Sequence, residues 1–369
     1  MRRQTRNAAP QRATSDHSKP IPLTPPVPRR TFISAVRINL VFLIAALILS
    51  LHSVPYELRV CFPPPDHGSD SPEALVAGTA STPYQYRVLL PWLVRGALEL
   101  HLIRPESQMA VFAGIQTVAL VLLGFVFRRY LSRFIADPVL ASVMALTVYA
   151  VLPFNYFNLP YYPYDIPSVL LFTVGLLLIY DRRWRWFFPL FVIATLNRET
   201  SIFLAAVSLF VLFDRYSWQR LGLIIGAQLA IWFAIKAFLW VLYQQNRWMG
   251  YGLYQFQLKV NLATLWTYPI KGVIALATWG CLWLAVVIWH RRIRDVYLKR
   301  TLWTVPVFIA GMMFAGFVIE LRIYGEVLPI VLAAFWVVFL DLIEDSIRSR
   351  REAGGGHGDL PVLEGSGSS

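Results

Sequence analysis

Residues 221–243 read LGLIIGAQLAIWFAIKAFLWVLY, an apolar run in which Lys236 is the single charged residue. A helix needs about 20 apolar residues to cross the roughly 30 Å hydrocarbon core of a bilayer, because each residue advances it by about 1.5 Å. This run is long enough to do so. Together with the apolar runs on either side of it, it predicts an integral membrane protein.

The composition of the whole chain leads to the same conclusion. Of 369 residues, 57% are hydrophobic and only 15% are charged, whereas about a quarter of a soluble domain is charged. These values exclude a soluble enzyme, a disordered protein and a disulfide scaffold. The net charge of +13 is distributed in short basic clusters between apolar runs, which is how membrane proteins encode their orientation, so it does not predict binding to nucleic acid.

Ten apolar runs are candidate membrane helices: 38–53, 108–127, 138–154, 167–180, 187–197, 199–213, 221–243, 272–289, 304–319 and 327–343. Between the first two, residues 88–103 place Arg95 and Glu99 four positions apart, which predicts an interfacial helix in the first outer loop. The predicted fold is therefore all-α, a polytopic transmembrane helical bundle. Its transmembrane domain, 38–343, lies between a disordered basic cytosolic tail, 1–37, and a flexible cytosolic tail, 344–369.

The distribution of Arg and Lys predicts how the bundle is oriented. With both termini in the cytosol, 24 of these residues face inward and nine face outward. This count treats residues 187–213 as a hairpin broken at Asn197-Arg198-Glu199. A single helix there would invert every later segment and leave two charges at the bilayer centre, at about 3 kcal/mol each. We therefore expect the hairpin, and a bacterial inner membrane protein with both termini cytosolic.

Four polar motifs fall on the predicted outer face: Tyr84-Gln85-Tyr86-Arg87, Tyr161-Tyr162-Pro163-Tyr164-Asp165, Asn197-Arg198-Glu199-Thr200 and Glu320-Leu321-Arg322-Ile323-Tyr324-Gly325-Glu326. Ionisable groups near membrane depth are candidates for function. Arginine binds phosphate oxygens in a bidentate fashion, and a carboxylate can accept the proton of an attacking hydroxyl. The four motifs therefore predict a site for an anionic, polyhydroxylated ligand.

Each motif also has a purely structural interpretation. Asp165 could cap the helix that begins at Ile166-Pro167, and the tyrosines could belong to an interfacial aromatic belt. Arg198 and Glu199 could pair with each other, and the segment from Glu320 to Arg322 could be an exposed loop. The aromatic loop 244–271 could bind sugar rings or polyprenyl chains, or form part of the same belt. What favours a site is the occurrence of all four motifs on one side.

In layout, the chain resembles the GT-C superfamily of integral-membrane glycosyltransferases. That resemblance implies an active site on the outer face, a polyprenyl-phosphate-linked sugar donor and a catalytic acid in the first outer loop. Members often carry an Asp-Glu pair soon after the first helix. Here this place holds Pro55-Tyr56-Glu57-Leu58-Arg59, so Glu57 is the matching acid, and Asp66, Asp70 and Asp165 are the alternatives.

The resemblance implies catalytic roles for Glu57 and Asp165. The residues expected to bind substrate are Tyr84, Tyr86, Arg87, Tyr164, Arg198, Glu199, Glu320, Arg322 and Glu326. No metal or cofactor is expected, since the chain has no metal-binding pair and no GxGxxG, P-loop or HExxH motif.

The predicted function is the transfer of a sugar from a polyprenyl-phosphate-linked donor to an outer-face acceptor, with membrane lipids and not nucleic acid as partners. A lipid-linked sugar flippase or transporter and a non-catalytic membrane assembly subunit are the alternatives. A transporter needs polar groups along a path through the membrane. The spans offer few, chiefly Gln116, Gln228 and Lys236, and Lys236 is expected to extend toward the interface.

Overall fold

The computed structural model describes residues 29–61, 71–155, 162–246 and 257–354, with side chains for 36–53, 71–155, 162–246 and 257–350. Over these residues the chain is all-helical, as predicted. It divides into two units, residues 1–41 and 42–369, and the packing described below concerns the second unit.

The α-helices are α1 (Arg29–Cys61), α2 (Pro72–Ala77), α3 (Leu89–Glu99), α4 (Gln108–Leu131), α5 (Pro138–Leu146), α6 (Val148–Val151), α7 (Asp165–Tyr180), α8 (Trp184–Asn197), α9 (Phe203–Leu212), α10 (Trp218–Leu242), α11 (Leu258–Thr267), α12 (Pro269–Leu276), α13 (Leu282–Trp289), α14 (Val296–Thr301), α15 (Thr304–Ala315) and α16 (Leu328–Gly354). Short 3₁₀ helices connect them: η1 (Tyr84–Tyr86), η2 (Pro105–Ser107), η3 (Leu152–Asn155), η4 (Glu199–Ile202), η5 (Thr278–Cys281), η6 (His290–Arg292) and η7 (Leu321–Val327).

Within the described part of the chain, five helical segments are long and apolar enough to cross a membrane: Val36–Ser53, Pro105–Leu131, Pro138–Asn155, Trp218–Leu242 and Leu321–Arg350. A bent pair, Pro269–Leu276 and Thr278–Arg292, is a sixth candidate, with 67° between its halves. Asp165–Tyr180 and Glu199–Leu212 are shorter apolar helices. Large apolar side chains such as Leu223 on α10, which is 74% exposed, face outward, as suits helices surrounded by lipid. These features support a membrane protein.

Some helices extend beyond their predicted limits. Helix α1 runs from Arg29 to Cys61, so it takes in the end of the predicted basic tail and the backbone of Glu57. Helix α16 runs on to Gly354, past the predicted end at 343. Asp341 and Asp345 lie one turn apart near the middle of α16, and both carboxylates bind Arg292, which favours helix past residue 343 over a flexible tail. Residues 1–28 and 355–369 of the predicted tails lie outside the described residues.

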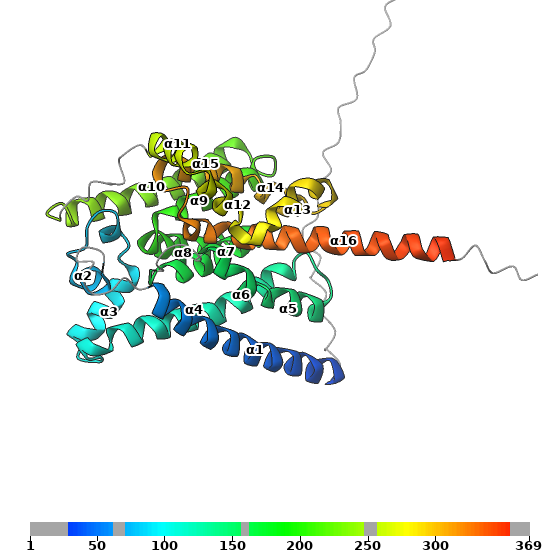
Figure 1. The fold of residues 1–369 in the computed structure, drawn as a ribbon, viewed down its shortest axis with the longest axis horizontal. Helices are drawn as coiled ribbons and strands as arrows, with labels where there is room; N and C mark the ends of the chain where they lie inside the picture. The colour runs from blue at the N-terminus through cyan, green and yellow to red at the C-terminus, as the bar shows by residue number, and fades with distance from the viewer. Residues whose placement is uncertain (1–28, 62–70, 156–161, 247–256, 355–369) are drawn as a thin grey trace, which may run out of the picture. The chain divides into compact units, whose positions relative to one another are not determined.

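Helix α7 lies at the centre of the packed core (Figure 1). It packs against α4, α8, α9, α16 and η7. Small residues permit close approach, as is usual in membrane bundles. At Gly124 of α4, a Cβ atom would lie 2.4 Å from the hydroxyl of Tyr149, and at Gly175 of α7 it would lie 2.7 Å from Leu204. The start of α7 is buried as well, since Asp165 is 1% exposed.

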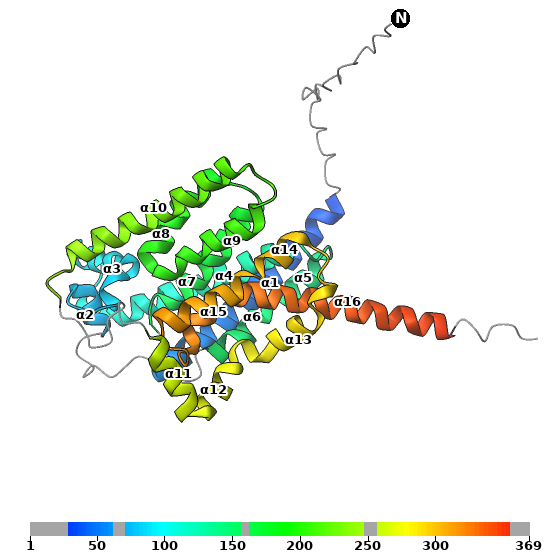
Figure 2. The same cartoon turned by 90° about the horizontal axis from the view of Figure 1, so that it is seen from above.

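The chain reverses direction between α8 and α9. Helix α8 ends at Asn197, and Arg198 has extended backbone angles, φ −159° and ψ 142°. The indole Nε1 of Trp184, at the start of α8, lies 3.4 Å from the hydroxyl of Tyr216, which follows α9. The two helices are thus antiparallel, and α10 lies alongside both of them (Figure 2). The predicted break at Asn197-Arg198-Glu199 is confirmed.

Candidate functional site

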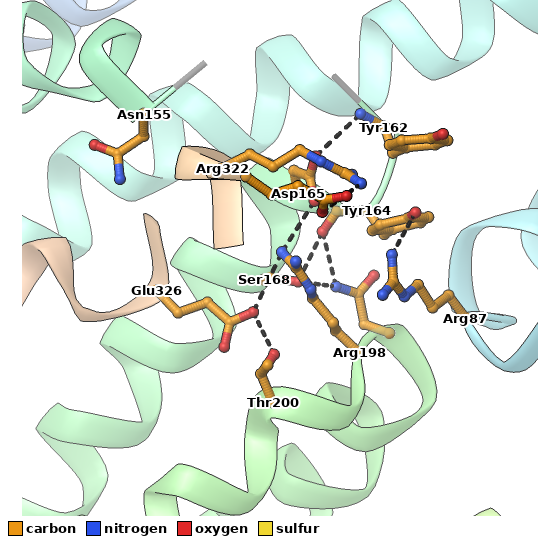
Figure 3. A network of polar contacts seen from close by, with 12 residues as sticks. Arg87, Asn155, Tyr162, Tyr164, Asp165, Ser168, Arg198, Thr200, Arg322 and Glu326 are labelled. Carbon is orange, nitrogen blue, oxygen red and sulfur yellow. Dashed lines mark hydrogen bonds and ion pairs between the residues drawn. The ribbon is translucent and has the colours of Figure 1, made fainter. Parts of the chain in front are cut away.

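Four segments that are distant in sequence meet at the start of α7. They are the turn after η1, which carries Arg87, the tyrosine-rich lead into α7, the break between α8 and η4, and η7. These segments contain the polar motifs picked out in the sequence. Their charged side chains form one connected network, drawn in part in Figure 3.

Asp165 is the centre of this network. One carboxylate oxygen, Oδ1, lies 3.0 Å from Nη1 of Arg198, and the other, Oδ2, lies 3.4 Å from Nη1 of Arg322. Oδ2 also accepts a hydrogen bond from the backbone N–H of Tyr162 at 3.0 Å. All three groups are buried. Asp165 is therefore the shared counter-ion of two arginines. The capping interpretation is wrong, because Asp165 is the first residue of α7, Tyr164 occupies the N-cap position, and no side-chain hydrogen bond caps the helix.

Arg87 and Glu199 form the second pair of the network. The Nη2 and Nε atoms of Arg87 donate to the two carboxylate oxygens of Glu199 at 2.7 and 3.3 Å. Nη1 of Arg87 donates to the hydroxyl of Tyr164 at 2.5 Å. Burial opposes the charge on Arg87, but the Glu199 carboxylate outweighs it and the pKa of Arg87 lies well above its usual value. The guanidinium is therefore always charged.

Arg198 lies between two acids (Figure 3). Its Nη1 atom is 3.0 Å from Asp165 and 3.6 Å from Oε1 of Glu326. The hydroxyl of Thr200 donates to the same Glu326 oxygen. Arg198 therefore pairs across the bundle with α7 and η7, and not with its neighbour Glu199. Because Arg322 is also buried, the exposed-loop interpretation of this segment is wrong as well.

The tyrosines form a stack beside these charges. The ring centroids of Tyr84 and Tyr162 are 5.0 Å apart, and those of Tyr162 and Tyr164 are 5.4 Å apart. The guanidinium of Arg322 lies 4.3 Å from the Tyr162 centroid, and that of Arg87 lies 4.6 Å from the Tyr164 centroid. Such cation–π contacts favour desolvated charge. These rings thus stabilise the charged arginines and do not only form an interfacial aromatic belt.

Lys236 also belongs to the network. It lies within the apolar helix α10, but its side chain is only 16% exposed, and its Nζ atom is 4.0 Å from Oε2 of Glu199. The expectation that it extends into the interface is therefore wrong, because Glu199 offers a closer counter-charge. Its presence in an otherwise apolar span was the sequence signal that it has a partner.

A polar cavity of about 150 Å³ opens beside the network. Its charged lining residues are Arg87, Arg198, Glu199, Glu320 and Arg322, and Tyr84 also lines it. A much larger cavity of about 860 Å³ lies next to it, lined mainly by apolar side chains of α9, α10 and α15. We call the first the polar cavity and the second the apolar groove. They share the lining residues Glu199, Thr200, Met312 and Ala315, so they adjoin each other.

Three buried nitrogen atoms at this junction make no hydrogen bond to any described residue. They are Nε of Arg198, Nε of Arg322 and Nζ of Lys236. A buried donor without an acceptor costs about 1–3 kcal/mol, and such groups point to a ligand. All three are cationic, so an anion is the ligand that would satisfy them.

The structure brings together most of the residues that the sequence predicted. Six of the predicted substrate-binding residues line the polar cavity, namely Tyr84, Arg87, Arg198, Glu199, Glu320 and Arg322, and a seventh, Tyr86, lines the apolar groove. Tyr164 and Glu326 are buried behind the cavity, where they contact its arginines.

The two predicted catalytic acids are placed differently. Asp165 lines neither cavity, and its geometry suits a residue that positions arginines. The side chain of Glu57 lies outside the described residues, as do Tyr161, Asp66 and Asp70.

Two residues that the sequence analysis named without assigning them a role in the site support it. Asn197 donates to the carbonyl oxygen of Tyr164 at 3.0 Å and to the hydroxyl of Ser168 at 2.8 Å, which fixes the chain reversal against α7. Gln116, on α4, donates to the carbonyl oxygen of Pro163 at 2.7 Å and so supports the tyrosine segment. The sequence did offer a signal for Gln116, because an amide buried within an apolar span needs a hydrogen-bond partner.

Over the described ranges, no group of three His, Cys, Asp or Glu residues is placed to hold a metal ion. Comparison of the chain with protein-family models, with curated proteins and with solved structures gave no match. The geometry of the site therefore has to carry the functional argument.

Proposed function

We propose that this chain is a membrane glycosyltransferase of the GT-C kind that moves a sugar from a polyprenyl-phosphate-linked donor to an acceptor. One observation carries the proposal: a small cavity rich in arginine adjoins a large apolar groove and shares four lining residues with it. A ligand that fills both has an anionic head and a long apolar tail. A polyprenyl phosphate has this shape and this charge.

The arginines of the polar cavity supply the donor contacts. The unsatisfied Nε atoms of Arg198 and Arg322 can donate to phosphate oxygens, and planar guanidinium groups bind phosphate with defined orientation. The ammonium of Lys236, which makes no described hydrogen bond, lies where the anionic head of the donor would join its apolar tail. The tyrosine stack holds the arginines in place, and an apolar chain fits the aromatic and aliphatic walls of the groove.

The transfer requires a base. The acceptor hydroxyl oxygen attacks the anomeric carbon, the bond from that carbon to the phosphate oxygen breaks, and the lipid phosphate leaves with the electron pair. The proton of the hydroxyl passes to a carboxylate. Of the carboxylates that line the polar cavity, Glu320 is the less committed, since its described ion pair is a single contact of 3.2 Å with Arg322. Glu320 is therefore our candidate base, with Glu57 as the sequence-based alternative.

The proposed layout has about ten membrane crossings, with the short helices α8 and α9 as a hairpin and the site open to the outer face of a bacterial inner membrane. Both termini are then cytosolic, and α3 lies at the interface. In a chain with Cys61 and Cys281 replaced by serine, Ser217→Cys should react with a membrane-impermeant thiol reagent from the cytosolic side and Glu106→Cys from the outer side. Labelling of both from the same side would overturn this layout.

Binding and transfer should be measured separately with purified full-length protein. Polyprenyl phosphate serves as the binding probe, and a panel of polyprenyl-phosphate sugars serves for transfer. Arg322→Lys keeps the charge but loses the planar fork, so we expect binding to weaken about tenfold or more, since one charge-assisted hydrogen bond is worth about 1.5–3 kcal/mol. Glu320→Gln should keep binding and lower transfer by about 10²–10⁴-fold. Glu99→Gln, on the exposed face of α3, is the matched control.

Each result bears on a different part of the proposal. Wild-type affinity for polyprenyl phosphate in Arg322→Lys would refute the binding site. If Glu320→Gln transfers normally and Glu57→Gln does not, the base is Glu57. Movement of the lipid-linked sugar across a bilayer without transfer would replace the glycosyltransferase with a flippase. Binding without either activity would indicate an assembly subunit.

A further inference from the structure

A separate cavity of about 460 Å³ lies at the opposite end of α7 from Asp165. The two ends of this 16-residue helix are about 24 Å apart, given a rise of about 1.5 Å per residue. The last turn of α7, the end of α9 and the start of α14 form its walls. Its volume falls in the range of about 300–1,000 Å³ that is typical of small-molecule sites. We call it the distal cavity.

The charges of the distal cavity are strongly basic. Arg182, Arg215 and Arg294 line it, with Asp295 as the acid among its lining residues. The Asp295 carboxylate accepts a hydrogen bond from the backbone N–H of Leu298 at 2.7 Å and so caps α14. Arg294 is paired with Asp341 at 3.2 Å, so Arg182 and Arg215 are the lining arginines without a salt bridge.

The carboxylates adjacent in sequence to Arg182 and Arg215 pair with other arginines. Asp181 pairs with Arg133 at 2.9 Å, and Asp214 accepts a bond from Nη2 of Arg300 at 2.6 Å. Among the described residues, neither Arg182 nor Arg215 forms a salt bridge. The Arg182 guanidinium lies 5.9 Å from the ring centroid of Tyr216. A hydrogen bond from Arg300 and the charge of Arg215 help to lower the pKa of the Asp214 carboxyl. The fold thus pairs the arginines that hold its helices together, whereas Arg182 and Arg215, which have no salt bridge, can bind a ligand.

The walls of the distal cavity are rigid. The rings of Tyr180 and Tyr297 meet edge to face with centroids 4.8 Å apart, and the Tyr297 hydroxyl donates to the carbonyl oxygen of Leu176 at 2.7 Å. Arg300 joins α14 to the segment after α9 through Asp214. These contacts hold the backbone segments that carry the lining arginines in place.

Arg182 stands where glycine is usual. The N–H of Arg182 donates to the carbonyl oxygen of Ile179, and that of Arg183 donates to the carbonyl oxygen of Leu178, which is the Schellman pattern at the end of a helix. The φ angle of Arg182 is +54°, in the left-handed region that glycine adopts without strain. The chain therefore keeps a long cationic side chain here against the local backbone preference.

Exposed tryptophans surround the same end of the bundle. They lie at or next to the first turns of three helices: Trp186 of α8 is 58% exposed, Trp218 of α10 is 75% exposed and Trp303, just before α15, is 64% exposed. Exposed tryptophan is typical of the level where membrane and water meet, which is also where lipid headgroups lie. Basic pockets between helices at this level bind anionic headgroups.

We infer that the distal cavity binds the phosphate group of an anionic ligand, with Arg182 and Arg215 as its main contacts. Two sources supply this chemistry, a phospholipid headgroup and a free phosphate ester, and the experiment separates them. This site stands apart from the polar cavity and does not depend on the proposed transferase activity.

The test uses full-length protein, first delipidated in neutral detergent, and native mass spectrometry. The probes are phosphatidylglycerol, phosphatidylcholine and glycerol 3-phosphate. We expect the wild type to retain phosphatidylglycerol in preference to phosphatidylcholine. Arg182→Gly and Arg215→Gln should each weaken that binding about tenfold or more, the loss expected for one charge-assisted contact. Arg185→Gln removes a neighbouring exposed charge outside the cavity lining and should change nothing.

Thermal unfolding separates binding from folding. Because glycine suits the left-handed position, Arg182→Gly should be at least as stable as the wild type while it binds less. Glycerol 3-phosphate that binds as tightly as the lipid, with the same dependence on Arg182, would assign the site to a free phosphate ester. Equal retention of both lipids without binding of glycerol 3-phosphate would overturn the inference. Equal losses in Arg182→Gly and Arg185→Gln would do the same.

Discussion

Replacing Asp165 with asparagine tests the central feature of the site. The substitution keeps the size of the side chain but removes the negative charge shared by Arg198 and Arg322. Both arginines are buried, with side chains only 3% and 5% exposed. We expect the protein to lose stability because two buried cations then share too little negative charge.

The structure allows the magnitude to be estimated. Removing one partner of a buried ion pair typically costs about 3–5 kcal/mol, because the other charge is left uncompensated. Here each arginine keeps a second acid, Glu326 at 3.6 Å from Arg198 and Glu320 at 3.2 Å from Arg322. We therefore expect Asp165→Asn to cost about 3 kcal/mol, at the lower end of that range.

The assay is equilibrium unfolding by SDS in mixed micelles, followed by far-UV circular dichroism. Glu99→Gln is the control, since it breaks an exposed pair of 2.9 Å with Arg95 on the surface of α3. Such a pair is worth about 0.5 kcal/mol or less. The double variant Asp165→Asn/Arg198→Gln removes one charge of each sign and should recover about 0.5–3 kcal/mol relative to the sum of the single changes.

Two results would refute the reasoning. A loss in Asp165→Asn no larger than that in Glu99→Gln would mean that Asp165 is not the counter-ion of buried arginines. A double variant whose loss equals the sum of its single losses would mean that Asp165 and Arg198 do not interact.

Three further predictions use the same unfolding assay. Gly124→Ala should destabilise the protein by about 1–3 kcal/mol, because its Cβ would lie 2.4 Å from the hydroxyl of Tyr149. Gly114→Ala on the same helix is the control and should be neutral or stabilising, because no atom lies within 4 Å of its Cβ. Equal effects of the two substitutions would disprove this close packing. Asn197→Ala should cost about 1–3 kcal/mol because two buried hydrogen bonds are lost, and an unchanged midpoint would contradict that role. Lys236→Met should leave the stability of the protein unchanged, since the Lys236 ammonium makes no described hydrogen bond, but it should weaken polyprenyl-phosphate binding. Wild-type binding by Lys236→Met would exclude Lys236 from the ligand site.

The membrane character and the helical class followed from the sequence alone. Both depend on local properties, namely the length of apolar runs and the scarcity of charge, and a helix satisfies its own backbone hydrogen bonds wherever its neighbours lie. The break at Arg198 was predictable for the same reason, since two adjacent charges do not belong at the centre of an apolar helix. Helix limits were less accurate, because contacts such as those from Arg292 to Asp341 and Asp345 extend α16 past its apolar run.

The pairing of the charged residues was decided only by the tertiary structure. The sequence predicted that Arg87, Asp165, Arg198 and Arg322 lie on one face, yet it gave no means of matching each cation to its acid. Arg87 and Glu199 are 112 residues apart, and Asp165 and Arg322 are 157 apart, so no local pattern relates them. The assignment of Asp165 as an anchor behind the cavity, and of Glu320 as an acid lining it, depends on how α7 and η7 pack. Packing is a non-local property, and it alone determines which charges share a low-dielectric interior.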